Sequence, residues 1–162
     1  MNKLPKYMPE SSGEAFKHIN AVTAPTIDDL KLMVYLEASG QVGYGDLADS
    51  APNEAVAKLL NANGREEVAH AHRVAKAIRA IYGEEFAVPE PADNPYAKRS
   101  GRKLDRAVLE GLVKAENFGK TLYDTWAGNT ANAEAANLFR QNGVEEAKHG
   151  ARAQEAIGLM GG

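Results

Sequence analysis

Two short stretches of this chain pair a glutamate with a histidine three residues later, Glu67 with His70 and Glu146 with His149. On an α-helix, residues three apart lie on the same face, one turn apart. A carboxylate and an imidazole placed in this way can bind one metal ion, or one ion each of a close pair. A single Glu-x-x-His spacing is weak evidence, because it occurs by chance in many helices. Two copies in one chain make a metal site a hypothesis worth pursuing.

The two motifs belong to a longer internal repeat. Thirty residues before each motif glutamate stands another glutamate, Glu37 in the first copy and Glu116 in the second. One offset of 79 residues relates all members of the two sets, and residues 37–78 laid on 116–157 without a gap give 15 identities in 42 positions. Two copies of this length are too few for a solenoid. They predict two helical hairpins packed about a pseudo-twofold axis.

The charges of the repeated residues indicate which ions the site would hold. Four carboxylates pointing into a bundle cost too much free energy to remain ionised without compensation. Two divalent cations would balance them, and neutral imidazoles would complete the ligand set. Carboxylate and imidazole ligands without thiolates suit iron or manganese, and zinc is possible. The six candidate metal ligands are Glu37, Glu67, His70, Glu116, Glu146 and His149.

Helical patterns and breakers define the elements that must position these residues. The sequence predicts a short helix within 12–22 and long helices over about 27–48, 50–82 with Pro52 in the first turn, 101–127, and from about 130 to just before Gly161. Thr26 suits an N-cap, and Gly83 suits a helix C-terminus. Three prolines between 83 and 99 mark a long crossover. No strand-like alternation of apolar residues occurs.

The predicted fold is therefore all-α: a four-helix bundle of two hairpins joined by a long crossover. We expect this bundle to span residues 25–162, after an N-terminal arm and short helix over residues 1–24. The arm is apolar enough that we expect it to pack on the bundle or on a partner subunit. We also expect a homodimer.

Composition limits the classes of function that remain. The chain has 162 residues, a net charge of −3 and no cysteine. The absence of cysteine excludes disulfides, thiolate catalysis and iron–sulfur or rubredoxin-type sites within this sequence. No excess of positive charge favours nucleic acid as a partner, and no apolar run is long enough to span a membrane. No signal peptide is visible at the N-terminus, so a cytoplasmic location is expected.

The sequence resembles the ferritin-like di-iron superfamily, and within it the rubrerythrin-like proteins. The resemblance covers roughly residues 27–160 and rests on Glu37, on residues 66–70, on residues 116–123 and on residues 145–149. It implies a ferritin-like bundle with two iron ions, bridged by the glutamates of the two Glu-x-x-His motifs. It also implies an oxidoreductase that reacts with peroxide or dioxygen.

The sequence departs from the rubrerythrin pattern in two ways. Rubrerythrins carry an additional glutamate one turn after the third-helix ligand, where this chain has Gly119. They also usually carry a rubredoxin-like domain, so electrons would come here from an external donor. The alternative is a ferritin-type protein that binds or stores iron. A third interpretation is a bundle that holds metal for stability alone.

Tyr44 and Tyr123 are the candidate catalytic residues outside the ligand set. They occupy equivalent positions two turns after Glu37 and Glu116, on the same helix face. A hydroxyl in this position can donate a hydrogen bond to a ligand or take part in electron transfer. Alternatively, it is satisfied within an ordinary core. The sequence leaves both interpretations open.

Other polar residues around the motifs also recur in both copies. Asn63 and Asn142 precede the motif glutamates by one turn, where they either orient ligands or tolerate an irregular turn. The glutamate directly before each motif is rotated by about 100° from the ligand face. We expect Glu66 and Glu145 to face solvent. Arg73 and Arg152 follow the histidines by three and either pair with a buried carboxylate or extend to solvent, and we expect the second.

Gly40 and Gly119 occupy matching positions one turn after Glu37 and Glu116. A glycine inside a helix costs about 0.5–1 kcal/mol relative to alanine, so its presence needs a reason. One reason is close packing of helices. The other is a pocket beside each outer ligand, which would leave coordination positions for water, dioxygen or peroxide.

Overall fold

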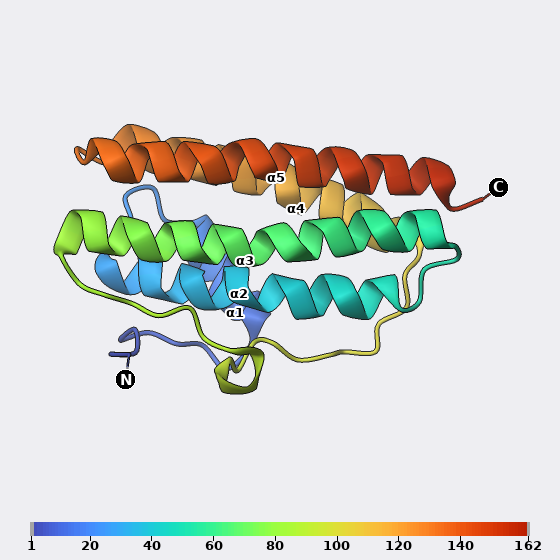
Figure 1. Cartoon of the computed structure of the whole chain (residues 1–162), viewed down its shortest axis with the longest axis horizontal. Helices are drawn as coiled ribbons and strands as arrows, with labels where there is room; N and C mark the ends of the chain where they lie inside the picture. The colour runs from blue at the N-terminus through green and yellow to red at the C-terminus, as the bar shows by residue number, and fades with distance from the viewer. Residues whose placement is uncertain (1, 162) are drawn as a thin grey trace.

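The computed structural model describes residues 2–161 as a bundle of long helices (Figure 1). The elements are α1 (Ser12–Asn20), α2 (Ile27–Ala48), α3 (Glu54–Tyr82), the 3-10 turn η1 (Pro91–Asp93), α4 (Arg106–Asn129) and α5 (Ala133–Leu159). No strand occurs within this described part. The all-α four-helix bundle predicted from the sequence is confirmed.

Local sequence explains where the helices begin and end. The Thr26 side chain accepts from the Asp29 backbone N–H while the Asp29 carboxylate accepts from the Thr26 N–H, a complete capping box at the start of α2. The Asn53 and Asn132 side chains cap α3 and α5 by accepting from the backbone N–H three residues further on, at equivalent positions of the two repeats. Gly83 ends α3 with a φ of 68°, in the left-handed region that glycine adopts without strain.

The helices pack as two hairpins. Helix α2 packs along α3, α4 packs along α5, and the hairpins meet through α3 and α5. The segment 83–105 crosses from the end of α3 to the start of α4 along the α2 side of the bundle (Figure 1). A buried cluster that includes Trp126, Tyr123 and Phe139 fills one half of the interior. The long crossover therefore joins two similar units side by side, as the repeat predicts.

The start of α4 differs from the sequence prediction. Helix α4 begins at Arg106 and not near residue 101, because the preceding segment is held in another conformation. The Asp46 carboxylate accepts from the backbone N–H groups of Ser100 and Gly101 at 2.8 and 3.0 Å. Gly101 has a φ of 68°, which is incompatible with a helix. A long-range contact therefore overrides the local helical pattern.

The N-terminal arm lies against its own chain. The Asn2 side chain exchanges hydrogen bonds with the Ala87 backbone, and the Tyr96 hydroxyl donates to the Pro9 carbonyl oxygen at 2.7 Å. Helix α1 packs on α2. Of the two positions expected for the arm, the bundle face is the one it occupies.

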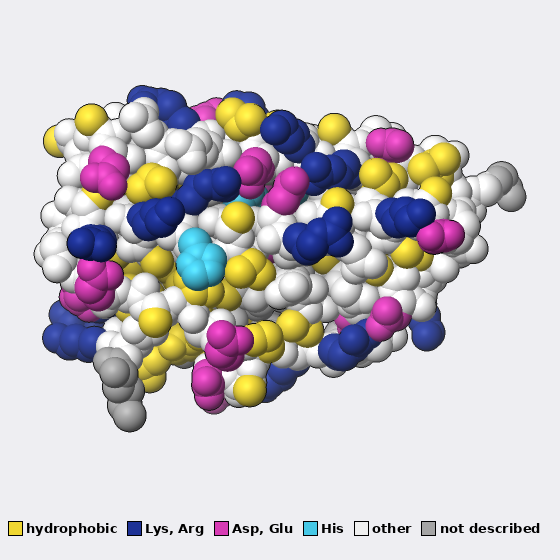
Figure 2. All heavy atoms as spheres, in the orientation of Figure 1, with side chains coloured by type: hydrophobic (Ala, Val, Ile, Leu, Met, Phe, Trp, Pro, Cys, Tyr) yellow, Lys and Arg dark blue, Asp and Glu magenta, His cyan; other side chains and the backbone are white. Residues whose placement is uncertain are grey.

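The outer face formed by α3 and α5 is polar. Figure 2 shows lysine, arginine, aspartate and glutamate side chains spread over this face, with hydrophobic side chains between them. In the described part of the chain, no helix is both long and apolar enough to cross a bilayer.

Candidate metal centre

All six candidate ligands lie in the interior at the middle of the bundle. Both histidines are fully buried at 0% exposure, and the four glutamates are between 5% and 8% exposed. Each of the four long helices contributes, α2 with Glu37, α4 with Glu116, and α3 and α5 with one Glu-x-x-His motif each. The ligating atoms of the two motifs lie within 4.8 Å of one another.

The imidazole Nδ1 atoms face the carboxylates. His70 Nδ1 lies 3.6 Å from Glu37 Oε2, 3.8 Å from Glu67 Oε2 and 3.7 Å from Glu146 Oε1. His149 Nδ1 lies 3.1 Å from Glu67 Oε1. Atoms bound to one ion at about 2.0–2.2 Å are separated by roughly 3–4 Å, so these spacings suit shared cations.

The second histidine has the mirrored surroundings. His149 Nδ1 is 3.6 Å from Glu116 Oε2 and 3.8 Å from Glu146 Oε2. The two imidazole rings stack with their centroids 5.0 Å apart and their planes 14° from parallel. Each histidine thus faces one outer glutamate and both motif glutamates, the arrangement expected for two ions side by side.

His70 Nδ1 supplies a direct test of whether the residues fit a metal. It is buried and has no hydrogen-bond partner among the described residues. A buried polar atom without a partner costs free energy, so such atoms are rare in native proteins. Its lone pair is directed at three carboxylates, which a bound cation would join. The donor set and this atom both fit a metal ion.

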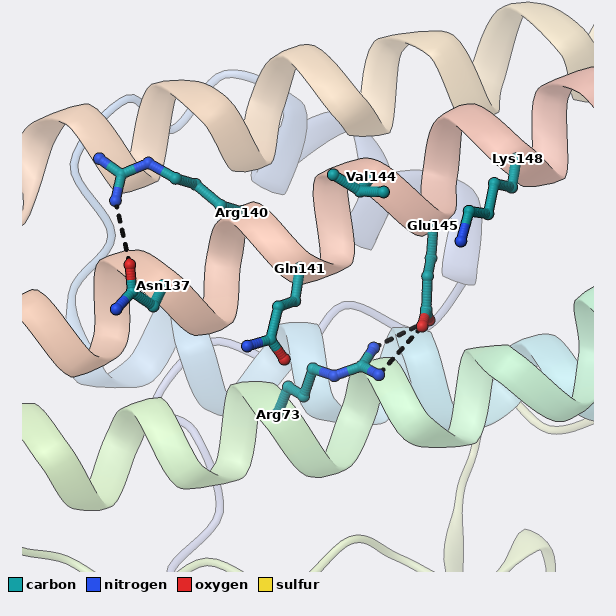
Figure 3. A pocket seen from close by; sticks show the side chains of 7 residues that line it. All are labelled: Arg73, Asn137, Arg140, Gln141, Val144, Glu145 and Lys148. Carbon is teal, nitrogen blue, oxygen red and sulfur yellow. Dashed lines mark hydrogen bonds and ion pairs between the residues drawn. The ribbon is translucent and has the colours of Figure 1, made fainter.

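The outer nitrogen of His70 is fixed by an ion pair. Its Nε2–H donates to Glu145 Oε2 at 2.8 Å. Arg73 binds both oxygens of the same carboxylate at 2.8 and 3.0 Å, as Figure 3 shows. Arg73 Nη1 also donates to Asn142, whose side-chain amide donates to the His70 carbonyl oxygen. A proton held on Nε2 leaves Nδ1 free to bind metal.

The same arrangement surrounds His149. Its Nε2–H donates to Glu66 Oε2 at 2.8 Å, and Arg152 binds that carboxylate at 2.7 and 3.0 Å. Asn63 accepts from Arg152 and donates to the His149 carbonyl oxygen.

The expectation that these glutamates and arginines face solvent is wrong, and pairing with a carboxylate, the alternative for the two arginines, is what the structure shows. They are partly buried between α3 and α5, where the helices are close enough for each pair to span the interface. The sequence feature that could have predicted these ion pairs is the recurrence of all four residues under the 79-residue offset, because a repeat that keeps the ligands also keeps their partners.

The two tyrosines reach across the bundle. Tyr44 donates from its hydroxyl to Glu116, and Tyr123 donates to Glu37. Each candidate outer ligand is therefore bound by the tyrosine of the other repeat. Of the interpretations left open for these residues, the hydrogen bond to a ligand carboxylate is the one observed.

Burial and charge give the four carboxyl groups different proton affinities. Burial, together with the charges of Glu37 and Glu116, raises the pKa of Glu67 well above its usual range. Burial and the neighbouring carboxylates raise the pKa of Glu146 likewise. Burial also acts to raise the pKa of Glu37, but the contacts of that carboxyl with His70 and Tyr123 outweigh it and lower the pKa. A cation bound beside the motif glutamates would favour their ionised form.

The ion pair of Glu66 and Arg152 beside His149 remains ionised, unlike the buried carboxyl groups of the motifs. The hydrogen bonds and charge of Arg152 lower the pKa of Glu66 to about 2. Glu66 therefore remains an ionised acceptor for the His149 imidazole at neutral pH.

Gly40 and Gly119 provide space for the motif glutamates. A Cβ at position 40 would lie 2.7 Å from Glu67 Cγ and 2.9 Å from Glu67 Cβ, and one at position 119 would lie 3.1 Å from Glu146 Cδ. These positions are filled by the neighbouring carboxylate side chains. Close approach therefore accounts for both glycines, and both also line a cavity beside Glu37 and Glu116, so the two interpretations hold together.

Comparison with known proteins agrees with this description. The fold and site define a ferritin-like helical bundle with a buried cluster of glutamates and histidines that can hold metal. The family model for rubrerythrin matches residues 29–157, so the chain belongs to the rubrerythrin family. Searches of curated proteins and of solved structures found no match.

Proposed function

We propose that this protein is a di-iron carboxylate oxidoreductase that reacts with peroxide or dioxygen, with manganese as the alternative metal. The observation that carries the proposal is the unpartnered His70 Nδ1, buried among three carboxylates. Glu67 and Glu146 would bridge the two ions. Glu37 with His70, and Glu116 with His149, would be the outer ligands. Bound iron would supply the electrons that reduce the oxidant.

The residues of this chain have distinct tasks in that function. The Glu66 and Glu145 carboxylates hold each imidazole with Nδ1 toward the site. Tyr44 and Tyr123 hold the outer carboxylates and keep a proton on each phenol, because burial and the neighbouring carboxylates raise the pKa of both hydroxyls. These protons lie next to the site where an oxidant would be reduced. Electrons to restore the reduced site would come from a separate donor.

The test is an anaerobic titration of the purified protein with Fe(II), followed by stoichiometric peroxide or dioxygen. Oxidation of two irons per chain by one peroxide, followed optically, would support the proposal. Bound iron that neither oxidant oxidises would contradict it. Storage of iron requires a closed assembly of many subunits, so light scattering separates that alternative: a monomer or dimer of the 17.4 kDa chain argues against storage.

A further inference from the structure

A groove runs along the bundle where α2 and α4 face each other. The backbones of these two helices lie farther apart than those within each hairpin or those of α3 and α5, and the hydrogen bonds of Tyr44 and Tyr123 span the gap. The space between them is a cavity of about 660 Å³, bounded on one side by α1 and the segment before α4. Cavities of roughly 300–1,000 Å³ are typical of sites for small organic ligands.

The walls of this groove are apolar, and its floor is formed by the candidate metal ligands. The apolar side chains come from three helices, namely Phe16, Met33, Leu36, Leu112, Phe118 and Leu122. The carboxylates of Glu37 and Glu116 line the same cavity. Phe16 and Phe118 are about half exposed, so part of the apolar wall is open to solvent. An occupant would place an apolar body directly over the carboxylate cluster.

Two glycines keep the groove open. Gly43 on α2 and Gly111 on α4 line it, and a Cβ at either position would meet no other atom within 4 Å. Close packing therefore does not explain them, unlike Gly40 beside Glu67. Each costs about 0.5–1 kcal/mol of helix stability relative to alanine. Both are exposed, so their effect on the structure is to leave the mouth of the groove open to solvent.

One end of the groove carries an excess of positive charge. Lys98 and Arg102 line it there, and neither forms an ion pair within residues 2–161. The Asp46 carboxylate lines it too, but Arg99 pairs with Asp46 and Asp49. The hydrogen bonds from Ser100 and Gly101 to Asp46 fix this segment to α2. Asp46 is nine residues after Glu37, about 14 Å along the helix. The positively charged end of the groove is therefore held about 14 Å from the candidate metal ligands, a distance that an extended organic ligand can span.

We propose that this groove binds an anionic amphiphile, a carboxylate with an unbranched hydrocarbon chain. The head group pairs with Lys98 and Arg102, and the chain lies between α2 and α4 with its far end over Glu37 and Glu116. The apolar walls supply affinity through burial, and the cationic end fixes the orientation. This assigns an organic ligand to the site of the proposed function. It rests on that function for the ligand's role, whereas binding itself depends only on the groove.

The probe is dodecanoate below its micelle-forming concentration, titrated calorimetrically into the full-length protein with and without Fe(II). We expect one molecule bound per chain, with butanoate and the uncharged dodecanol each binding at least tenfold more weakly. Gly111→Leu should lower the affinity for dodecanoate at least tenfold by filling the groove. Gly128→Leu is the control, because Gly128 is an exposed glycine of the same helix outside the groove. The double variant Lys98→Ala with Arg102→Ala should weaken the binding of dodecanoate but not the binding of dodecanol.

Three results would overturn the proposal. The first is that dodecanoate does not bind, and the second is that Gly111→Leu binds it as tightly as Gly128→Leu does. The third is that light scattering shows a dimer that Gly111→Leu converts to a monomer. The last result would mean that a second copy of the chain fills the groove. Metal content of the same samples is measured separately. Dodecanoate binding in a protein that takes up no metal would contradict the proposed function alone, and a two-metal protein without dodecanoate binding would contradict this inference alone.

Discussion

The Glu66 carboxylate on α3 accepts a hydrogen bond from the His149 imidazole on α5, with 2.8 Å between Nε2 and Oε2. A residue of the first repeat thereby orients a candidate ligand of the second, and Glu145 does the same for His70. The tyrosine hydrogen bonds also join the two repeats, since Tyr44 binds Glu116 and Tyr123 binds Glu37. Neither hairpin holds a complete site, so the geometry of the centre depends on how the two hairpins pack.

Removing the charge of Glu66 should weaken metal binding without unfolding the bundle. Glu66→Gln keeps the side-chain shape but loses the ion pair with Arg152 and the charged acceptor for His149. Loss of such a partner typically costs about 10–100-fold in metal affinity. Competition with a chromophoric chelator measures it. Glu155→Gln, an exposed glutamate on α5, is the control, and equal affinities for the two variants would exclude a positioning role for Glu66.

The sequence predicts the fold and the membership of the site well, because both follow from local patterns. Helical periodicity and caps such as Thr26 define the long helices, and the 79-residue offset brings together the residues that the structure places in one cluster. Contacts between elements could not be predicted from the sequence in this way. The pairing of Arg73 with Glu145 depends on the spacing of α3 and α5, and the late start of α4 depends on Asp46, which is far away in the sequence. The open groove between α2 and α4 has no sequence signature of its own.

The two glycines on successive turns of α2 should respond oppositely to alanine. Gly40→Ala places a methyl group within 2.9 Å of Glu67 Cβ, an atom close to the backbone of α3 that cannot easily move. The variant should lose both stability and metal. Gly43→Ala meets nothing and should be neutral or stabilise the helix by up to about 1 kcal/mol. Chemical denaturation and elemental analysis of the two variants check this, and a stable, metal-replete Gly40→Ala would show that α2 and α3 are not closely packed here.

Gly119→Ala should have a smaller effect than Gly40→Ala. The nearest atoms, at 3.1 Å, belong to the carboxylate end of Glu146, which can shift. A larger loss of metal at 119 than at 40 would contradict this ranking.

Tyr44→Phe should destabilise the protein by about 1.5–3 kcal/mol, the usual contribution of a hydrogen bond to a charged group. The ring keeps its packing while the buried Glu116 carboxylate loses its donor. Denaturant unfolding of the metal-free protein measures the loss. Tyr82→Phe serves as control, because Tyr82 is about half exposed and lies at the end of α3, away from the carboxylate cluster. If both variants unfold at the wild-type denaturant concentration, the hydroxyl does not bind the carboxylate.

Removing metal should lower the melting temperature more at high pH than at low pH. Burial and neighbouring charge raise the pKa of Glu67 and Glu146 in the metal-free fold above the ordinary value of 4.5. Their contribution to stability is therefore complete below that value and is lost as pH rises through the raised pKa.

His149 acts in the same direction in the metal-free protein. Although its burial acts to lower the pKa, the neighbouring Glu116 and Glu66 outweigh that effect and raise it. Bound cations remove this dependence by compensating the carboxylates. We expect the difference in melting temperature between loaded and metal-free protein to widen from about pH 5 to about pH 8. Calorimetric scans at both pH values measure it, and a difference that narrows would refute this account of the charges.

The central claim is that Glu67 and Glu146 join two metal ions between α3 and α5. Elemental analysis of the purified, Fe(II)-loaded protein tests it most directly, together with the single variants Glu67→Ala and Glu146→Ala. We expect two ions per chain in the wild type and fewer than two in each variant, because each replacement removes a ligand shared by both ions. Two ions per chain in both variants, or none in the wild type, would contradict the claim.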